Sequence, residues 1–177
     1  MPLPTVMFIR HAEKPEKSEK GVTHDGEHDE HSLSVRGWTR AGALAALFTN
    51  SNSRDLLQQP ERIIATEPDH AYKSKREHDT ALPTANRLGL DIEATTIPDD
   101  YSTLTESITG SGTPTLVVWH HGSIPAFISA LPVSNTEEVP ISWPEDRFDL
   151  IWVLHPEGSS YTWHQVKQEL LEGDALG

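Results

Sequence analysis

Hydrophobic residues along the chain fall into short continuous runs that alternate with segments of helical spacing. Runs of about five apolar residues bounded by polar or turn residues are typical of buried strands. Such runs occur at residues 5–9, 62–66, 115–119 and 150–154, and residues 92–98 are a further candidate strand. Residues 150–154 and 161–166 flank turn residues around Gly158 and predict two strands joined in a hairpin.

The segments between these runs carry apolar residues at helical spacing. A helix is predicted from Ser34, a candidate N-cap, because Trp38, Ala41, Ala45 and Phe48 share one face. A second helix is predicted over residues 76–88, where Gly89 ends it and Pro83 marks a kink or a late start. Shorter helices are predicted at residues 101–108 and 126–131.

This alternation of strands and helices predicts the architecture. Strands that alternate with helices form a mainly parallel sheet with helices on both faces, which is a three-layer α/β/α sandwich. We find no internal repeat and no biased linker that would divide the chain. We therefore expect one domain over residues 1–177.

Composition narrows the class of protein. Hydrophobic residues make up 36% of the 177 residues and charged residues 23%, which is typical of a soluble globular chain. No apolar run reaches the roughly 20 residues of a membrane helix, and residues 6–9 are too few for a signal-peptide core. We therefore expect a cytoplasmic location. The absence of cysteine excludes disulfides, thiolate zinc sites and a cysteine nucleophile.

The net charge of −13 constrains the partners. A field of this sign repels nucleic acid and anionic membranes, so we expect neither as a partner. It also opposes anionic substrates, unless cationic side chains gather in one pocket. A phosphate-handling site in this chain must therefore concentrate arginine locally.

Cationic and imidazole side chains do follow the predicted strands. Arg10 and His11 come directly after one strand, and His120 and His121 directly after another, while Arg76 follows a third strand across a loop. Ligands of open α/β sheets bind at the carboxyl ends of the strands. Guanidinium groups bind phosphate oxygens in a bidentate manner. These residues therefore predict a site for a small tetrahedral dianion.

Five sequence motifs extend this pattern over nearly the whole chain. They are Arg10-His11-Ala12-Glu13-Lys14-Pro15, Leu33-Ser34-x-x-Gly37 with Arg40-Ala41, Arg76-x-x-x-Thr80-Ala81, Trp119-His120-His121-Gly122-Ser123-Ile124-Pro125, and Trp143-Pro144 followed by Phe148-Asp149. In this order they resemble the motifs of the histidine phosphatase superfamily, the phosphoglycerate mutase-like proteins. The fourth resembles a branch with the pattern Trp-x-His-x-x-Ile-Pro. The resemblance implies a phosphoglycerate mutase-like fold.

The resemblance also implies a mechanism. His11 would attack phosphorus and become a phosphohistidine, which water then hydrolyses. Arg10, Arg76 and His121 would bind the phosphoryl oxygens together with His11 and neutralise their charge. Because cationic side chains supply this charge, the resemblance implies neither a metal ion nor a cofactor. The implied partner is a small phosphorylated substrate.

The second histidine could be His120 or His121. Alignment of Trp119 and of Ile124-Pro125 with the branch pattern favours His121. His120 is then a neighbour that shapes the pocket or points toward the sheet.

The acid that protonates the leaving group is also open. Related acid phosphatases carry aspartate directly after the second histidine, where this chain has Gly122. The mutase-like branch uses a glutamate after the second arginine. Asp100 lies in about that region and is our candidate; Asp99, Glu13 and Glu106 are alternatives. Without such an acid, phosphohistidine or aryl phosphates become the favoured substrates.

Residues 16–31 form a polar segment in which His24, His28 and His31 alternate with acidic residues. Two histidines four residues apart could bind a metal ion from one helical face. The segment lacks apolar periodicity, however, so we expect a solvated acidic loop that could serve as a lid.

The main prediction is a metal-independent phosphatase for a small phosphomonoester or phosphohistidine. A phosphoglycerate mutase-type phosphotransferase is a second possibility, but the sequence has no further cluster of arginine or lysine for a second anionic group. A catalytically idle module that binds phosphate or a partner is a third, and metal storage in the histidine-rich loop is a fourth.

Overall fold

The computed structural model describes residues 1–51 and 54–175. It contains a central sheet with the strand order β3-β2-β4-β1-β5-β6. The strands are β1 (Val6–Ile9), β2 (Arg62–Thr66), β3 (Ile92–Thr95), β4 (Thr115–Val118), β5 (Leu150–Glu157) and β6 (Ser160–Lys167). Each lies on a run predicted from the sequence, although β5 and β6 extend beyond the predicted ends.

The first four strands of that order are parallel, and β5 and β6 are antiparallel to their neighbours. β5 and β6 form the predicted hairpin, in which Glu157 pairs with Ser160 across a two-residue turn. Gly158 begins that turn with a φ of 66°, a left-handed conformation that glycine adopts without strain. The sheet is therefore mainly parallel, as predicted.

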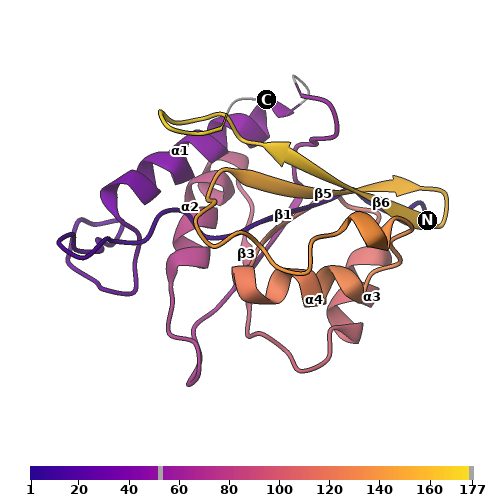
Figure 1. Ribbon diagram of the computed structural model, residues 1–177, viewed down its shortest axis with the longest axis horizontal. Coiled ribbons are helices and arrows are strands. Elements are labelled where there is room, and N and C mark those ends of the chain that lie inside the picture. The colour runs from indigo at the N-terminus through magenta and orange to yellow at the C-terminus, as the bar shows by residue number, and fades with distance from the viewer. Residues whose placement is uncertain (52–53, 176–177) are drawn as a thin grey trace.

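Helices cover both faces of the sheet (Figure 1). They are α1 (Val35–Thr49), α2 (Arg76–Leu88), α3 (Ser102–Thr109) and α4 (Ile124–Ser129), with short 3-10 helices at His121–Ser123 and Thr136–Glu138. α1 and α2 lie on one face, and α3 and α4 lie on the other. The predicted three-layer α/β/α sandwich is thus confirmed.

Alternating side chains of the strands fill two separate cores. Met7 and Ile9 of β1 pack with Leu44 and Phe48 of α1 on one face. On the opposite face Phe8 packs with residues of α3 and α4, such as Ile108 and Phe127. Strand residues point alternately to the two faces, so a strand that is buried on both reads as a continuous apolar run.

The helix ends follow the predicted signals. The Ser34 hydroxyl accepts a hydrogen bond from Gly37 N at 3.0 Å and caps α1. Gly89, with a φ of 68°, ends α2. Pro83 lies inside this continuous helix, so it does not mark a late start.

No helix among the described residues is long and apolar enough to cross a membrane. The single-domain organisation and the cytoplasmic location stay predictions.

Candidate active site

The strand order places the two histidine segments side by side. β1 and β4 are parallel neighbours in which Ile9 pairs with Val118, and Trp119 N donates to Ile9 O at 2.9 Å. The residues that follow these strands therefore meet at one edge of the sheet. The ring centroids of His11 and His121 are 6.4 Å apart.

His11 is held as a neutral imidazole. Its side chain is buried, and Nδ1 lies 2.6 Å from Ala12 O, so Nδ1 carries the proton and donates it to this carbonyl. Burial lowers the pKa of His11 to about 3; the Ala12 hydrogen bond opposes this shift, and the charges of Arg10 and Arg76 add to it. Nε2 thus keeps a free lone pair at neutral pH.

The start of α2 positions the peptide that follows His11. Ala12 N donates to Thr80 Oγ1 at 2.8 Å, and that hydroxyl donates to Arg76 O at 2.6 Å. The motif Arg76-x-x-x-Thr80 therefore places a hydroxyl one turn after the arginine, where it binds the backbone beside His11. The four-residue spacing of Arg76 and Thr80 therefore has a structural reason, in addition to its resemblance to the family motif.

The start of α1 supports the same segment. Both the backbone N and the hydroxyl of Ser34 donate to Glu13 O at 3.0 Å. A Cβ on Gly37 would lie well inside van der Waals contact with the same carbonyl. Glycine in the Leu33-Ser34-x-x-Gly37 motif thus lets the backbone after His11 approach the helix closely.

Arg10 is buried beneath the loop that precedes β5. Its guanidinium carbon lies 4.2 Å from the centroid of the Phe148 ring, a cation–π contact, and Nη1 donates to Glu145 O. Burial lowers the pKa of Arg10, against an opposing effect of Glu77, but arginine stays charged at any working pH. Within the described part of the chain, buried Nε has no hydrogen-bond partner.

Arg76 begins α2 and faces the segment that precedes α1. Its Nε donates to Ser32 O at 3.0 Å and its Nη2 to Glu30 O at 2.6 Å. Arg76 also lines a pocket of about 570 Å³ against residues 15–30. The loop predicted as a lid therefore forms one wall beside the second arginine.

His121 faces a smaller pocket of about 260 Å³, lined also by Arg10, Lys14, Glu145 and Asp146. Burial lowers the pKa of His121 to about 4, and the charge of Arg10 adds to this effect. In residues 1–51 and 54–175, buried Nδ1 of His121 has no hydrogen-bond partner. The structure thus brings Arg10, His11 and His121 together. Arg76 lines a different pocket, although its charge also lowers the pKa of His11. The catalytic roles of these residues stay a proposal.

The contacts of Asp100 are local, and its role as the acid stays a prediction. Its carboxylate is exposed and accepts hydrogen bonds from Ser102 N at 2.9 Å and Ser102 Oγ at 3.0 Å. These bonds lower the pKa of Asp100, whereas a proton donor near neutral pH needs a raised pKa. Asp100 instead stabilises the start of α3.

The alternative carboxylates also have other positions. Glu13 accepts hydrogen bonds from Arg40 at 2.8 to 3.0 Å. Asp99 and Glu106 are exposed on the segment around α3.

The histidine-rich segment is an ordered loop. Val22 forms bridges with His28 and Leu33, and Trp38 Nε1 donates to Val22 O at 2.7 Å. Exposed His24 lies 3.3 Å from Asp25. Among the residues that the structure describes, no three His, Asp or Glu side chains gather so that they could hold a metal ion.

Sequence reasoning missed three residues at the site. Tyr72 and buried Glu77 lie behind His120, and Lys14 lines the small pocket. A glutamate at the start of a helix is common on protein surfaces, so nothing local marks Glu77 as buried. Phe148 was part of a motif, but its contact with Arg10 joins residues that are far apart in the sequence.

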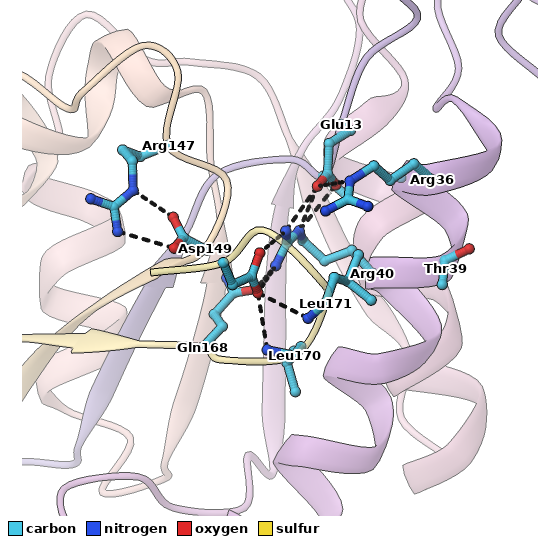
Figure 2. Close-up of polar contacts among 12 residues, drawn as sticks. Glu13, Arg36, Thr39, Arg40, Arg147, Asp149, Gln168, Leu170 and Leu171 are labelled. Atoms are coloured by element: carbon cyan, nitrogen blue, oxygen red, sulfur yellow. Dashed lines mark hydrogen bonds and ion pairs between the residues drawn. The ribbon is translucent and has the colours of Figure 1, made fainter. Parts of the chain in front are cut away.

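A buried ion-pair network supports the segment after His11 from behind (Figure 2). Arg40 binds Glu13, Gln168 and Asp174, with Nη2 at 2.7 Å from Asp174 Oδ1. Asp174 also accepts hydrogen bonds from the backbone of Leu170 and Leu171. The C-terminal segment is therefore fastened to α1 and, through Glu13, to the segment that carries His11.

No family model matches the sequence, and no curated protein matches it significantly. Several solved structures share the fold. Mycobacterial glucosyl-3-phosphoglycerate phosphatase Rv2419c has a TM-score of 0.56 and 16% identity, over 93% of this chain and 97% of its own. Mycobacterial hydrolase 1 has a TM-score of 0.59 and 17% identity, over 95% and 100%.

A protein from Agrobacterium tumefaciens assigned as the phosphohistidine phosphatase SixA is also similar. It has a TM-score of 0.55 and 18% identity, over 93% of this chain and 96% of its own. These neighbours are matched over nearly their full length. This chain therefore shares the fold of these proteins, in agreement with the phosphoglycerate mutase-like fold that its sequence motifs implied.

Proposed function

We propose that this chain is a phosphatase that hydrolyses a small phosphomonoester or a phosphohistidine through a phosphohistidine intermediate on His11. One observation carries the proposal. A buried neutral histidine, with Nδ1 fixed by Ala12 O, lies among the cationic side chains of Arg10 and Arg76 and beside His121. A nucleophile for phosphorus needs such a free lone pair and such surrounding charge.

In the first step His11 Nε2 attacks phosphorus in line, and the bond from phosphorus to the leaving oxygen breaks. Arg10 and Arg76 neutralise the charge on the phosphoryl oxygens. Arg10 Nε has no partner in the described chain, so a phosphoryl oxygen could satisfy its N–H. Nδ1 of His121, once it carries a proton, would donate a hydrogen bond to a phosphoryl oxygen in the same way.

In the second step water attacks the phosphohistidine and inorganic phosphate leaves. Cationic side chains supply the charge that a metal ion supplies in other phosphatases, so the proposed mechanism uses no metal ion and no cofactor.

The fold neighbours support the reaction class. One is named a glucosyl-3-phosphoglycerate phosphatase, and another is assigned as a phosphohistidine phosphatase. The pocket beside Arg10 and His121 has a volume of about 260 Å³, which has room for a phosphoryl group and a small leaving group.

Hydrolysis of para-nitrophenyl phosphate with EDTA present tests the proposal. We expect turnover by the wild type and none above background in His11→Ala. His155→Ala, which removes an exposed histidine of β5, is the matched control and should keep wild-type turnover. Absence of turnover by folded wild type, or equal turnover in His11→Ala, would contradict the proposal.

A further inference from the structure

The proposed reaction leaves one chemical need unmet, and the inference below rests on that proposed function. An alkoxide is a poor leaving group, so a phosphomonoester of an ordinary alcohol needs a proton donor. Asp100 and Glu13 are engaged elsewhere, as described above. Another group must donate the proton if alkyl phosphates are substrates.

A hydrogen-bonded chain of three side chains ends at the site. Glu77 is fully buried; Tyr72 Oη donates to its Oε1, and Ser74 Oγ donates to its Oε2 at 3.0 Å. Tyr72 Oη also lies 3.0 Å from His120 Nδ1. The chain therefore runs from a buried carboxyl group through a phenol to an imidazole.

His120 is the end of this hydrogen-bonded chain that lies next to the proposed phosphate site. Its ring centroid is 4.9 Å from that of His121, and its backbone N donates to Thr66 Oγ1 at 3.2 Å. A Cβ on Gly122 would lie 3.0 Å from His120 Nε2. Because Gly122 has no side chain, there is room beside its exposed backbone for the Nε2 end of the His120 ring.

We propose that His120 Nε2–H protonates the leaving oxygen and that Tyr72 passes the replacement proton from Glu77 to His120. Before transfer, protonated Glu77 donates to Tyr72 Oη, and Tyr72 donates to His120 Nδ1. During transfer the leaving oxygen takes the Nε2 proton, His120 Nδ1 takes the phenolic proton, and Tyr72 takes the carboxyl proton.

After transfer Glu77 is a carboxylate that accepts from Tyr72, and His120 Nδ1–H donates to Tyr72 Oη. Tyr72 Oη and Glu77 Oε1 are hydrogen-bonded in the structure, and the same contact serves both directions of transfer. When water attacks the phosphohistidine, His120 Nε2 takes a proton from that water and the chain runs in reverse. The cycle returns every proton to its starting atom.

The electrostatics of the chain support this direction. Burial raises the pKa of Glu77 and that of Tyr72, while burial and the charge of Arg10 lower the pKa of His120. Each shift favours the neutral form of its group, which is the protonated carboxyl group for Glu77 and the unprotonated imidazole for His120. The charged or titratable groups that face the chain are Arg10, Arg76 and His121.

Glu145 and Asp146 are the competing donors, because both line the pocket with Arg10 and His121. Both are exposed on the loop before β5. The test must therefore separate these carboxylates from the chain through Tyr72.

Tyr72→Phe is the variant that tests the relay, since it keeps the ring and removes the hydroxyl link. Tyr101→Phe is the matched control: its hydroxyl accepts from Trp119 Nε1 at 3.2 Å, near the site but outside the chain. Single-turnover rates with enzyme in excess report the first step alone. They are measured with para-nitrophenyl phosphate and with glycerol phosphate.

We expect Tyr72→Phe to slow release of glycerol by about 100-fold, the lower end of the range for general acid catalysis. Release of para-nitrophenolate, which needs no proton, should change by less than about 3-fold in the same regime. Tyr101→Phe should match the wild type with both substrates. Glu77→Gln, which cannot supply the proton, should slow release of glycerol by a similar factor and leave release of para-nitrophenolate unchanged.

Four results would overturn the relay. Equal loss with both substrates indicates a structural role for Tyr72. Loss of glycerol release in Glu145→Gln or Asp146→Asn, with none in Tyr72→Phe, assigns the acid to the loop. Wild-type rates in Tyr72→Phe, where His11→Ala is inactive, reject the relay and leave the proposed function intact. A wild type that releases no para-nitrophenolate rejects both.

Discussion

His11 shows how local contacts set the chemistry of one residue. A free histidine is partly protonated near neutral pH, and a protonated ring cannot attack phosphorus. Here the Ala12 carbonyl fixes the proton on Nδ1, and burial keeps Nε2 unprotonated down to a pKa of about 3. The proposed nucleophile thus has its free lone pair before any substrate binds.

The same pKa makes stability depend on pH. The folded pKa of about 3 lies below the usual value of 6.5, so the unfolded chain binds a proton that the folded chain does not. The contribution of His11 to the free energy of unfolding is therefore present above pH 6.5 and is lost as the pH falls toward 3. Between pH 6.5 and 5 the loss is about 2 kcal/mol.

We therefore expect His11→Asn to lose about 2 kcal/mol less stability than the wild type over that interval. Urea unfolding at the two pH values measures the difference. His155→Asn, which changes an exposed histidine, should keep the wild-type dependence. Identical pH dependence in His11→Asn and the wild type would show that His11 is not held neutral.

At the residue scale, the sequence predicted those site residues that directly follow strands. Arg10, His11 and His121 stand next to apolar runs, so their position follows from strand geometry alone. Asp100 was chosen only for its distance along the chain from Arg76, and in the structure its carboxylate binds Ser102. Glu77 could not be identified, because its burial depends on residues outside its own helix.

At the scale of single elements, the N-terminal end of α1 requires a residue without a side chain at Gly37. Gly37 lies against the Glu13 carbonyl, two residues after His11, and against Leu33 Cβ at 3.1 Å. Gly42, in the same helix, has nothing within 4 Å of its Cβ position. The two glycines therefore differ in role although both are helical.

Gly37→Ala should destabilise the protein by about 1 to 3 kcal/mol, because the new methyl group forces the backbone after His11 away from α1. Phosphatase turnover should fall as well, since that segment positions the nucleophile. Gly42→Ala should leave turnover unchanged and add up to about 1 kcal/mol through helix propensity. Thermal unfolding and para-nitrophenyl phosphate turnover measure both. Equal effects of the two variants would refute the proposed role of Gly37.

Element types were predicted well because local signals agree with tertiary contacts. Ser34 and Gly89 mark helix ends through their own backbone and side-chain chemistry. The ends of the strands were predicted less well. β5 and β6 continue to pair with each other beyond the residues predicted for each strand. Cross-strand pairing of this kind has no signature within a single strand.

Over the whole molecule, the Arg40 network joins the two ends of the chain (Figure 2). Arg40 and Asp174 side chains are 3% and 5% exposed. The pair Arg62 and Glu93 has a similar distance of 2.7 Å, but Glu93 is 51% exposed. Burial rather than geometry distinguishes these two ion pairs.

Asp174→Asn should cost about 3 kcal/mol, because it leaves part of the buried Arg40 charge uncompensated. Glu93→Gln, the same chemical change at the exposed pair, should cost less than about 1 kcal/mol. Urea unfolding of the two variants provides the comparison. A cost of Asp174→Asn no greater than that of Glu93→Gln would show that the network does not stabilise the fold.

The α/β/α architecture was predictable from the alternation of apolar runs and helical segments. The order of the strands was not, because pairing between β1 and β4 joins residues far apart in the sequence. That pairing is also what brings His11 and His121 to one site. The contact of Arg10 with Glu145 could not be predicted for the same reason, because the two residues are 135 positions apart in the sequence.

The account depends most on His11 as the residue that receives the phosphoryl group. The most direct measurement is to quench a reaction with para-nitrophenyl phosphate in alkali, where phosphohistidine survives, and to locate the phosphoryl group by peptide mass spectrometry. We predict one phosphoryl group on His11 in the wild type and none in His11→Asn. Turnover without a phosphoryl group on His11, or with one on His120 or His121, would contradict the account.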